Sequence, residues 1–171
     1  TEEEAPAELY VRDADGTHQK LARLSPNEAR RTLGVRLAPD GNNLEEVRHL
    51  RNITEQWEER IRTGQLPRGL AWQSLTTTVL RSIQYGLPAT TMSEKQCEFV
   101  MNPLLRQGLP SAGIVRVLPR QLVYGPIDFQ GIGIPNLYVA QEISHIERIL
   151  KYSTDQGNLT GQLMRASMEQ M

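Results

Sequence analysis

The chain has 171 residues, of which 39% are hydrophobic, and a formal net charge of −1. This length suits one domain, or one domain with a small appendage, and allows a hydrophobic core. Cys97 is the sole cysteine, which excludes an intrachain disulfide and gives no sign of an oxidising compartment. No apolar run approaches the roughly 20 residues that span a bilayer, and the acidic N-terminus lacks a signal-peptide core. We therefore expect an intracellular protein, cytoplasmic or nuclear, with no membrane segment.

The net charge conceals a separation of charge along the chain. Residues 1–59 carry eight basic and thirteen acidic side chains, residues 60–127 carry eight and two, and residues 128–171 carry three and five. Arginine outnumbers lysine sixteen to three. Because guanidinium groups match phosphate oxygens in a bidentate geometry, the basic middle suits an anionic partner. Solvated helix faces are the simpler interpretation of the charges alone.

The first 41 residues predict a disordered acidic lead-in over 1–8 and a small β element over 9–41. Strands over 9–11 and 20–24 flank Asp13-Ala14-Asp15-Gly16, whose composition favours a hairpin turn. Ser25-Pro26-Asn27-Glu28 resembles a helix-capping box, which predicts one or two helical turns to about Arg31. Leu33-Gly34-Val35 with Leu37 then predicts a short buried strand, ended by a turn over 38–41.

Residues 42–171 predict a helical domain. The first helix begins at Asn43, whose side chain we expect to cap it, and ends near Gly64. A second, antiparallel helix begins at Pro67, and a third begins at a Ser93 capping box and bends at Pro103. The residues expected to face inward on the first two helices are Leu44, Val47, Leu50, Trp57 and Ile61, then Leu70, Ala71, Leu75, Val79, Ser82 and Ile83.

The C-terminal part predicts two more helices after a region rich in Gly and Pro. That region, 108–135, contains strand-like pieces over 113–118 and 121–124. A fourth helix runs to about Tyr152, with Val139, Ile143, Ile146 and Leu150 expected to face inward, and a last helix covers 159–168. The fold class is therefore mainly α, a bundle of about five helices with a small N-terminal β-hairpin element.

No group of residues indicates catalysis. Asp13 and Asp15 open a string like a calcium loop, but its remaining ligands are absent, so a hairpin turn explains them. Gly131-Ile132-Gly133 precedes a helix as phosphate-binding loops do, yet it lacks the third glycine and a βαβ unit. Cys97 lies on an apolar helical face, where a buried structural thiol is expected. We expect no cofactor, no metal site and no catalytic residue in this chain.

Six different short sequence strings are spread along the chain from about Leu24 to the C-terminus. They are Arg31-Thr32-Leu33-Gly34-Val35, Asp40-Gly41-Asn42, Tyr85-Gly86-Leu87-Pro88-Ala89-Thr90, Gln96-Cys97, Pro119-Arg120 with Tyr124-Gly125-Pro126, and Gln130-Gly131-Ile132-Gly133-Ile134-Pro135. In this order and spacing, the chain resembles the region that follows the polymerase palm in LINE-like, non-LTR retrotransposon reverse transcriptases.

The resemblance implies a fragment of an RNA-directed DNA polymerase that is not catalytic on its own. In that family a Leu-Gly pair, here Leu33 and Gly34, lies in the hairpin that grips the primer strand. The catalytic carboxylates lie upstream of that pair, and Tyr10-Val11-Arg12-Asp13-Ala14-Asp15 does not fit their Tyr-x-Asp-Asp pattern. Two-metal phosphoryl transfer requires those carboxylates. The implied parts are the edge of a palm over 9–41 and a thumb over 42–171, which would work with the palm and fingers of the parent enzyme.

The resemblance and the charge map together predict binding of a template–primer duplex, RNA–DNA or DNA, through its phosphates, which positions a duplex without reading its sequence. The residues predicted to bind nucleic acid are Arg30, Arg31, Leu33, Gly34, Arg36, Arg62, Arg68, Arg81, Arg106, Arg116 and Arg120. The alternative is a domesticated reverse-transcriptase remnant that acts as a protein–protein interaction module. In that case the acidic ends and the apolar helical faces would matter more than the arginines.

Overall fold

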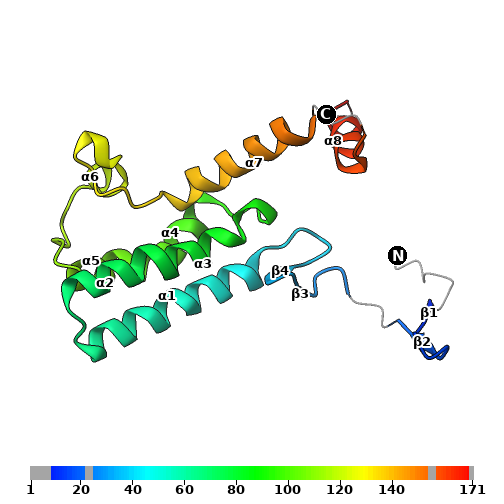
Figure 1. Cartoon of the computed structure of the whole chain (residues 1–171), viewed down its shortest axis with the longest axis horizontal. Coiled ribbons are helices and arrows are strands. Elements are labelled where there is room, and N and C mark those ends of the chain that lie inside the picture. The colour runs from blue at the N-terminus through cyan, green and yellow to red at the C-terminus, as the bar shows by residue number, and fades with distance from the viewer. Residues whose placement is uncertain (1–8, 22–24, 154–156, 170–171) are drawn as a thin grey trace.

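The computed structural model describes residues 9–21, 25–153 and 157–169. Within these ranges, two separate two-stranded antiparallel sheets precede a set of packed helices (Figure 1). The predicted fold class, mainly α with a small N-terminal β element, is therefore confirmed. The lead-in expected over 1–8 lies outside the described residues.

The first hairpin pairs β1 (Tyr10–Arg12) with β2 (His18–Lys20), and all six strand residues are exposed. Its turn is held by Asp13, whose Oδ1 accepts from the Ala14 amide at 2.7 Å and whose carbonyl accepts from the Gly16 amide at 2.9 Å. The predicted hairpin and its turn are confirmed, but the second strand covers His18–Lys20 and shares only Lys20 with the strand predicted over 20–24. Positions 22–24, expected to extend that strand, lie outside the described residues.

The second hairpin pairs β3 (Arg30–Thr32) with β4 (Val35–Leu37). The helix predicted to run to Arg31 is wrong, because the Ser25 segment forms only a turn, in which the Glu28 amide donates to the Ser25 carbonyl at 2.9 Å. A helical turn fixes many dihedrals for its first hydrogen bond, whereas residues 30–32 find a complete ladder opposite 35–37. Leu33, predicted within a buried strand, lies instead in the exposed turn of this hairpin.

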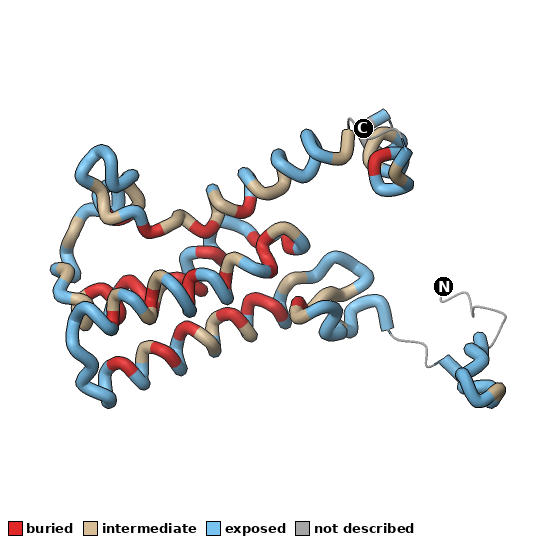
Figure 2. Tube along the Cα trace, viewed as in Figure 1, coloured by how far each residue is buried: buried red, intermediate tan, exposed pale blue. Residues whose placement is uncertain are grey.

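The core of the molecule lies between three long helical segments (Figure 1). The first is α1 (Leu44–Gly64). The second joins α2 (Arg68–Ser74) to α3 (Leu80–Tyr85) through a π-helical turn over Leu75–Val79, and runs antiparallel to α1. The third joins α4 (Glu94–Pro103) to α5 (Leu109–Ser111) through a π-helical turn over Leu104–Gly108. Figure 2 shows buried residues along the inner sides of these helices.

Most of the predicted inward faces of α1 and α2–α3 are confirmed, and three positions are wrong. Leu44, Leu70 and Ser82 are exposed, since the first two lie near helix starts that no neighbouring helix covers. The predicted cap is also displaced. Asn42 Oδ1 accepts from the Leu44 amide at 2.9 Å, whereas the Asn43 side chain donates to Thr91 Oγ1 at 3.0 Å.

Helix α4 confirms the capping box predicted at Ser93, and at Pro103, where a bend was predicted, the α-helix gives way to a π-helical turn. Ser93 and Gln96 form a reciprocal capping box at its start. Pro103 ends the α-helical part, and because proline has no amide hydrogen, the carbonyl of Phe99 loses its helical donor. The Arg51 guanidinium of α1 donates to that carbonyl and lies 4.4 Å from the centre of the Phe99 ring. The arginine thus ties α1 to α4 at the break.

The strands predicted over 113–118 and 121–124 are wrong. Residues 113–118 form turns and loop, and residues 120–124 form α6 (Arg120–Tyr124), with Pro119 as its N-cap residue. The glycine motif after α6 has a structural explanation. A Cβ on Gly131 would lie 2.0 Å from the Gly125 carbonyl oxygen, and the Gly133 amide donates to that oxygen at 2.9 Å. The glycines therefore allow two backbone segments to pass close to each other, and the Gly133 amide is bonded within the chain instead of facing a phosphate.

The last two helices are α7 (Leu137–Ser153) and α8 (Leu159–Glu169). The inward face predicted for α7 is wrong, because Leu137 and Gln141 are buried and the predicted residues Val139, Ile143, Ile146 and Leu150 are exposed. Gln141 Oε1 accepts from the Met92 amide at 2.9 Å, and its Nε2 donates to the Met92 carbonyl at 3.0 Å. Helical periodicity shows which residues share a face, but not which face is covered. Beyond its first turns, α7 extends away from the core (Figure 2).

Candidate nucleic-acid interface

The tip of the β3–β4 hairpin is an exposed part of the predicted interface. Leu33 and Gly34 occupy the two turn positions with φ of 50° and 96°, and positive φ at both positions is typical of tight hairpins of this kind. Leu33 is 88% exposed. Arg31 lies opposite Arg36 in the ladder, and Arg30 lies opposite Leu37. The hairpin therefore brings three of the predicted arginines beside the predicted Leu-Gly pair.

This hairpin is fixed to the helices by three contacts. Val35 is buried and packs close to Gly86, where an added Cβ would come within 3.4 Å of it. The Arg36 amide donates to Glu46 Oε2 at 2.7 Å, and the Tyr85 hydroxyl donates to the Leu33 carbonyl at 2.9 Å. Contacts from both α1 and α3 thus hold the exposed tip in one orientation.

The three arginines of the hairpin differ in how available they are. Arg31 is exposed, and Arg30 is exposed but forms an ion pair of 2.7 Å with Glu28. Arg36 is half-buried, and its Nη1 atom is buried without a hydrogen-bond partner among the described residues. Burial lowers the pKa of the neighbouring His49, and the positive charge of Arg36 lowers it further. Arg30 and Arg31 are the better candidates for phosphate contact.

Two further predicted arginines line one groove, whose other lining residues include several from α4. Arg106 and Arg120 line an open groove of about 520 Å³ together with Glu94, Glu98 and Asn102. The carboxylates come from α4 and the arginines from the π-helical turn and α6. A phosphate in this groove would be attracted by the two arginines and repelled by the two glutamates, so the groove attracts it less strongly than the number of arginines indicates.

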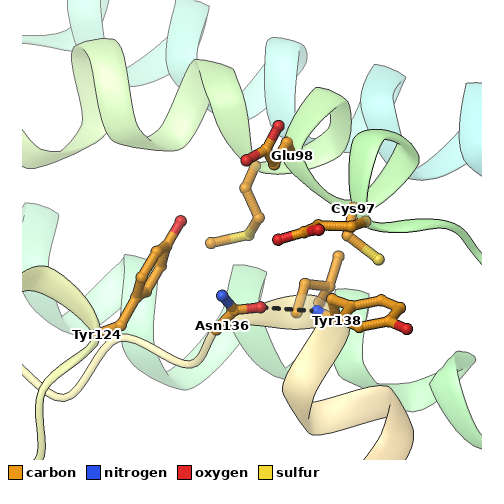
Figure 3. Close-up of a pocket in the computed structure, with 8 residues that line it drawn as sticks. Cys97, Glu98, Tyr124, Asn136 and Tyr138 are labelled. Atoms are coloured by element: carbon orange, nitrogen blue, oxygen red, sulfur yellow. Dashed lines mark hydrogen bonds between the residues drawn. The ribbon is translucent and has the colours of Figure 1, made fainter. Parts of the chain in front are cut away.

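A small pocket next to that groove contains the only cysteine. It lies between α4, α6 and the start of α7, has a volume of about 30 Å³ and is shown in Figure 3. Burial raises the pKa of Cys97 to about 11, and Glu142 and Glu94 add to the shift. Burial also raises the pKa of Tyr124, against the effect of Arg120. A thiol that stays protonated is a poor nucleophile, so Cys97 is a structural residue, as predicted.

The remaining predicted arginines are spread over separate elements. Arg62, in the last turn of α1, lies 3.7 Å from Glu58. Arg68 begins α2 and lies across Gly113, where a Cβ would come within 2.9 Å of its side chain. Arg81 on α3 and Arg116 in the loop before α6 are exposed. The structure therefore brings together two groups, the hairpin set and the groove pair, and leaves four arginines apart from both.

Sequence analysis missed the polar residues that position these elements. Glu46 and Gln141 are 2% and 1% exposed; Glu46 satisfies the amide of Arg36, ten residues away, and Gln141 satisfies both backbone groups of Met92, 49 residues away. Both occupy positions where helical periodicity places a residue on the inner face. That placement is the only signal that could have identified them, because polar side chains in a helix are ordinarily expected in solvent.

The described residues contain no cluster of three or more His, Cys, Asp or Glu side chains that could hold a metal ion. In the same part of the chain, no helix combines the length and apolarity needed to cross a membrane. Comparison of the chain with protein-family models, with curated proteins and with solved structures finds no match.

Proposed function

We propose that the chain is a thumb-like module of a retroelement reverse transcriptase, which binds template–primer duplex through its phosphates and has no catalytic activity alone. The observation that carries the proposal is the β3–β4 tip. An apolar residue, Leu33, is held out from the bundle in the turn that follows Arg30 and Arg31, while contacts to Glu46 and Tyr85 fix the orientation of the hairpin. Arg30 and Arg31 suit contact with the phosphates of a nucleic acid, and Leu33 offers an apolar surface beside them that the bundle does not cover.

The chemistry of polymerisation is assigned to the parent enzyme. A palm and fingers would supply the carboxylates for two metal ions, and this chain would hold the duplex, RNA–DNA or DNA, near them. The single buried cysteine is compatible with a cytoplasmic or nuclear protein. Two groups of arginines support the binding role, the hairpin group and the pair formed by Arg106 and Arg120.

The test is the salt dependence of duplex binding. Fluorescence anisotropy of a labelled RNA–DNA duplex, titrated with the 171-residue chain at several salt concentrations, gives the slope of log affinity against log salt. A backbone-binding surface gives a slope of about −0.9 for each phosphate contact. We expect Arg30→Glu with Arg31→Glu to weaken binding at least tenfold and to reduce the slope by about two contacts.

A second pair, Arg106→Glu with Arg120→Glu, tests the groove in the same way. The matched control is Arg48→Glu with Arg148→Glu, which changes the net charge equally on α1 and α7. The proposal fails if the control weakens binding as much as the test pairs do. It also fails if the unaltered chain binds duplex with no dependence on salt.

A further inference from the structure

The outward side of α7 is an apolar stripe. Val139, Ile143, Ile146 and Leu150 are 50%, 51%, 56% and 65% exposed. Their spacing along the helix is four, three and four residues, which places them on one line and matches the seam positions of a heptad repeat. Since a helix rises 1.5 Å per residue, the stripe is roughly 16 Å long, about three turns.

This stripe cannot be covered by rotating the helix within the fold. The opposite side of α7 carries Leu137 and Gln141, which are buried, and Gln141 is bonded to both backbone groups of Met92. Rotation would break those bonds and leave buried polar groups without partners. Helix α8 packs against α7, yet the four residues remain exposed with α8 in place.

The charges beside the stripe select the kind of helix that fits it. Glu142 borders one side and Glu147 the other, and both are exposed. The other two bordering positions are Ala140 and Ile149, so none of the four positions that border the stripe is basic. A second copy of α7 would therefore offer no opposite charge in either orientation, and a parallel pair would set Glu142 against Glu147. A partner with lysine or arginine at its own bordering positions would pair with both.

We propose that this face of α7 is a docking site for a basic amphipathic helix from outside the chain. The partner helix would have apolar residues at the same three- and four-residue spacing and basic residues on both sides of them. Apolar contact along the seam would supply the affinity, and the two carboxylates would supply the choice of partner. The site does not involve the arginines assigned to duplex binding, so it stands or falls separately from that function.

The test uses two synthetic peptides of about three heptads, each with leucine at the seam positions. One carries lysine at the bordering positions and the other carries glutamate. With fluorescein-labelled peptides and the full 171-residue chain, we expect the lysine peptide to bind at least tenfold more tightly. Exchanging the carboxylates, Glu142→Lys with Glu147→Lys, should reverse the preference. Both residues are exposed, and circular dichroism checks that the helix content is unchanged.

A variant of the seam separates apolar docking from simple charge attraction. Ile146→Asp adds a negative charge, so it should strengthen lysine-peptide binding if charge alone acts and weaken it at least tenfold if the seam binds. The matched control is Val117→Asp in the loop before α6, also an exposed apolar position, and it should change nothing. Equal binding of the two peptides, no binding of either, or a chain dimer that Ile146→Asp dissociates would each overturn the proposal. Duplex affinity should be the same with and without Ile146→Asp.

Discussion

The two N-terminal hairpins are alike in size and opposite in setting. Each pairs two three-residue antiparallel strands, and each has a glycine with positive φ in its turn, Gly16 or Gly34. All strand residues of β1–β2 are exposed, whereas β4 begins with the buried Val35 and receives a buried carboxylate from α1. The residues of the turn therefore suffice to form the β1–β2 hairpin. The β3–β4 hairpin is in addition fixed in position by its contacts with α1 and α3.

The largest effect is expected from removing the carboxylate that holds the second hairpin. Glu46→Ala leaves the Arg36 amide without its acceptor in a buried site and creates a small cavity. We expect the free energy of unfolding, measured by urea denaturation, to fall by about 2–3 kcal/mol. Glu45→Ala is the control, since Glu45 is exposed and forms its ion pair with the exposed Arg48, and should change it by less than about 0.5 kcal/mol. Equal losses would show that Glu46 does not anchor the hairpin.

The next effect compares the two turn glycines. At Gly34, φ is 96° and an added Cβ would lie 3.3 Å from the Tyr85 ring, so Gly34→Ala strains a hairpin that is attached to the core. We expect a loss of about 1–2 kcal/mol in the same denaturation experiment. Gly16→Ala strains a hairpin whose strand residues are all exposed, and the main unfolding transition should not move. If both changes shift it equally, the first hairpin also packs on the helices.

A smaller effect is expected from the hydroxyl that clamps the tip. Tyr85→Phe removes one hydrogen bond, to the Leu33 carbonyl, at an exposed position. We expect a loss of about 0.5–1 kcal/mol, visible as faster amide hydrogen exchange in β4 with no change in β1–β2. Unchanged exchange at residues 35–37 would mean that Val35 and Glu46 hold the hairpin without Tyr85.

The smallest effect is a pH dependence at the base of the second hairpin. Burial lowers the pKa of His49 below 6.5 in the folded chain. The positive charges of Arg36 and Arg31 lower it further, and the negative charge of Glu46 opposes the shift in part. The unfolded chain therefore takes up a proton first as the pH falls through 6.5, so stability present above that pH declines below it. Denaturation midpoints at pH 7.5 and 5.5 should differ less in His49→Gln than in the unaltered chain. The same difference in both would assign the effect to other groups.

Signals that depend on neighbouring residues could be read from the sequence. The capping box at Ser93 and the turn at Asp13 both follow from contacts within a few residues, and both are confirmed. The capping pattern at Ser25 failed because β3–β4 pairing offered the following residues a complete ladder. Strands predicted after Gly113 failed because β-branched residues form a sheet only where a partner strand exists.

The candidate interface was less accessible from the sequence than the fold. Charge counts located the arginines but not their surroundings, and Arg36 proved half-buried while Arg62 lies beside Glu58. Leu33 was expected in a strand, and its exposure depends on the turn that Gly34 permits. The anchoring roles of Glu46 and Tyr85 depend on contacts that span ten and 52 residues of chain, which no local pattern encodes.

The side chain of Gln141 presents one donor and one acceptor to Met92, the same pair that a peptide group presents to a neighbouring strand. Helix α7 is therefore joined to the extended segment before α4 as if by a single rung of a β-ladder. A slip of the helix by one residue would bring Ala140 or Glu142 to that rung, and neither side chain has both groups. One amide thus sets the register of a 17-residue helix, and with it the direction in which the apolar stripe faces.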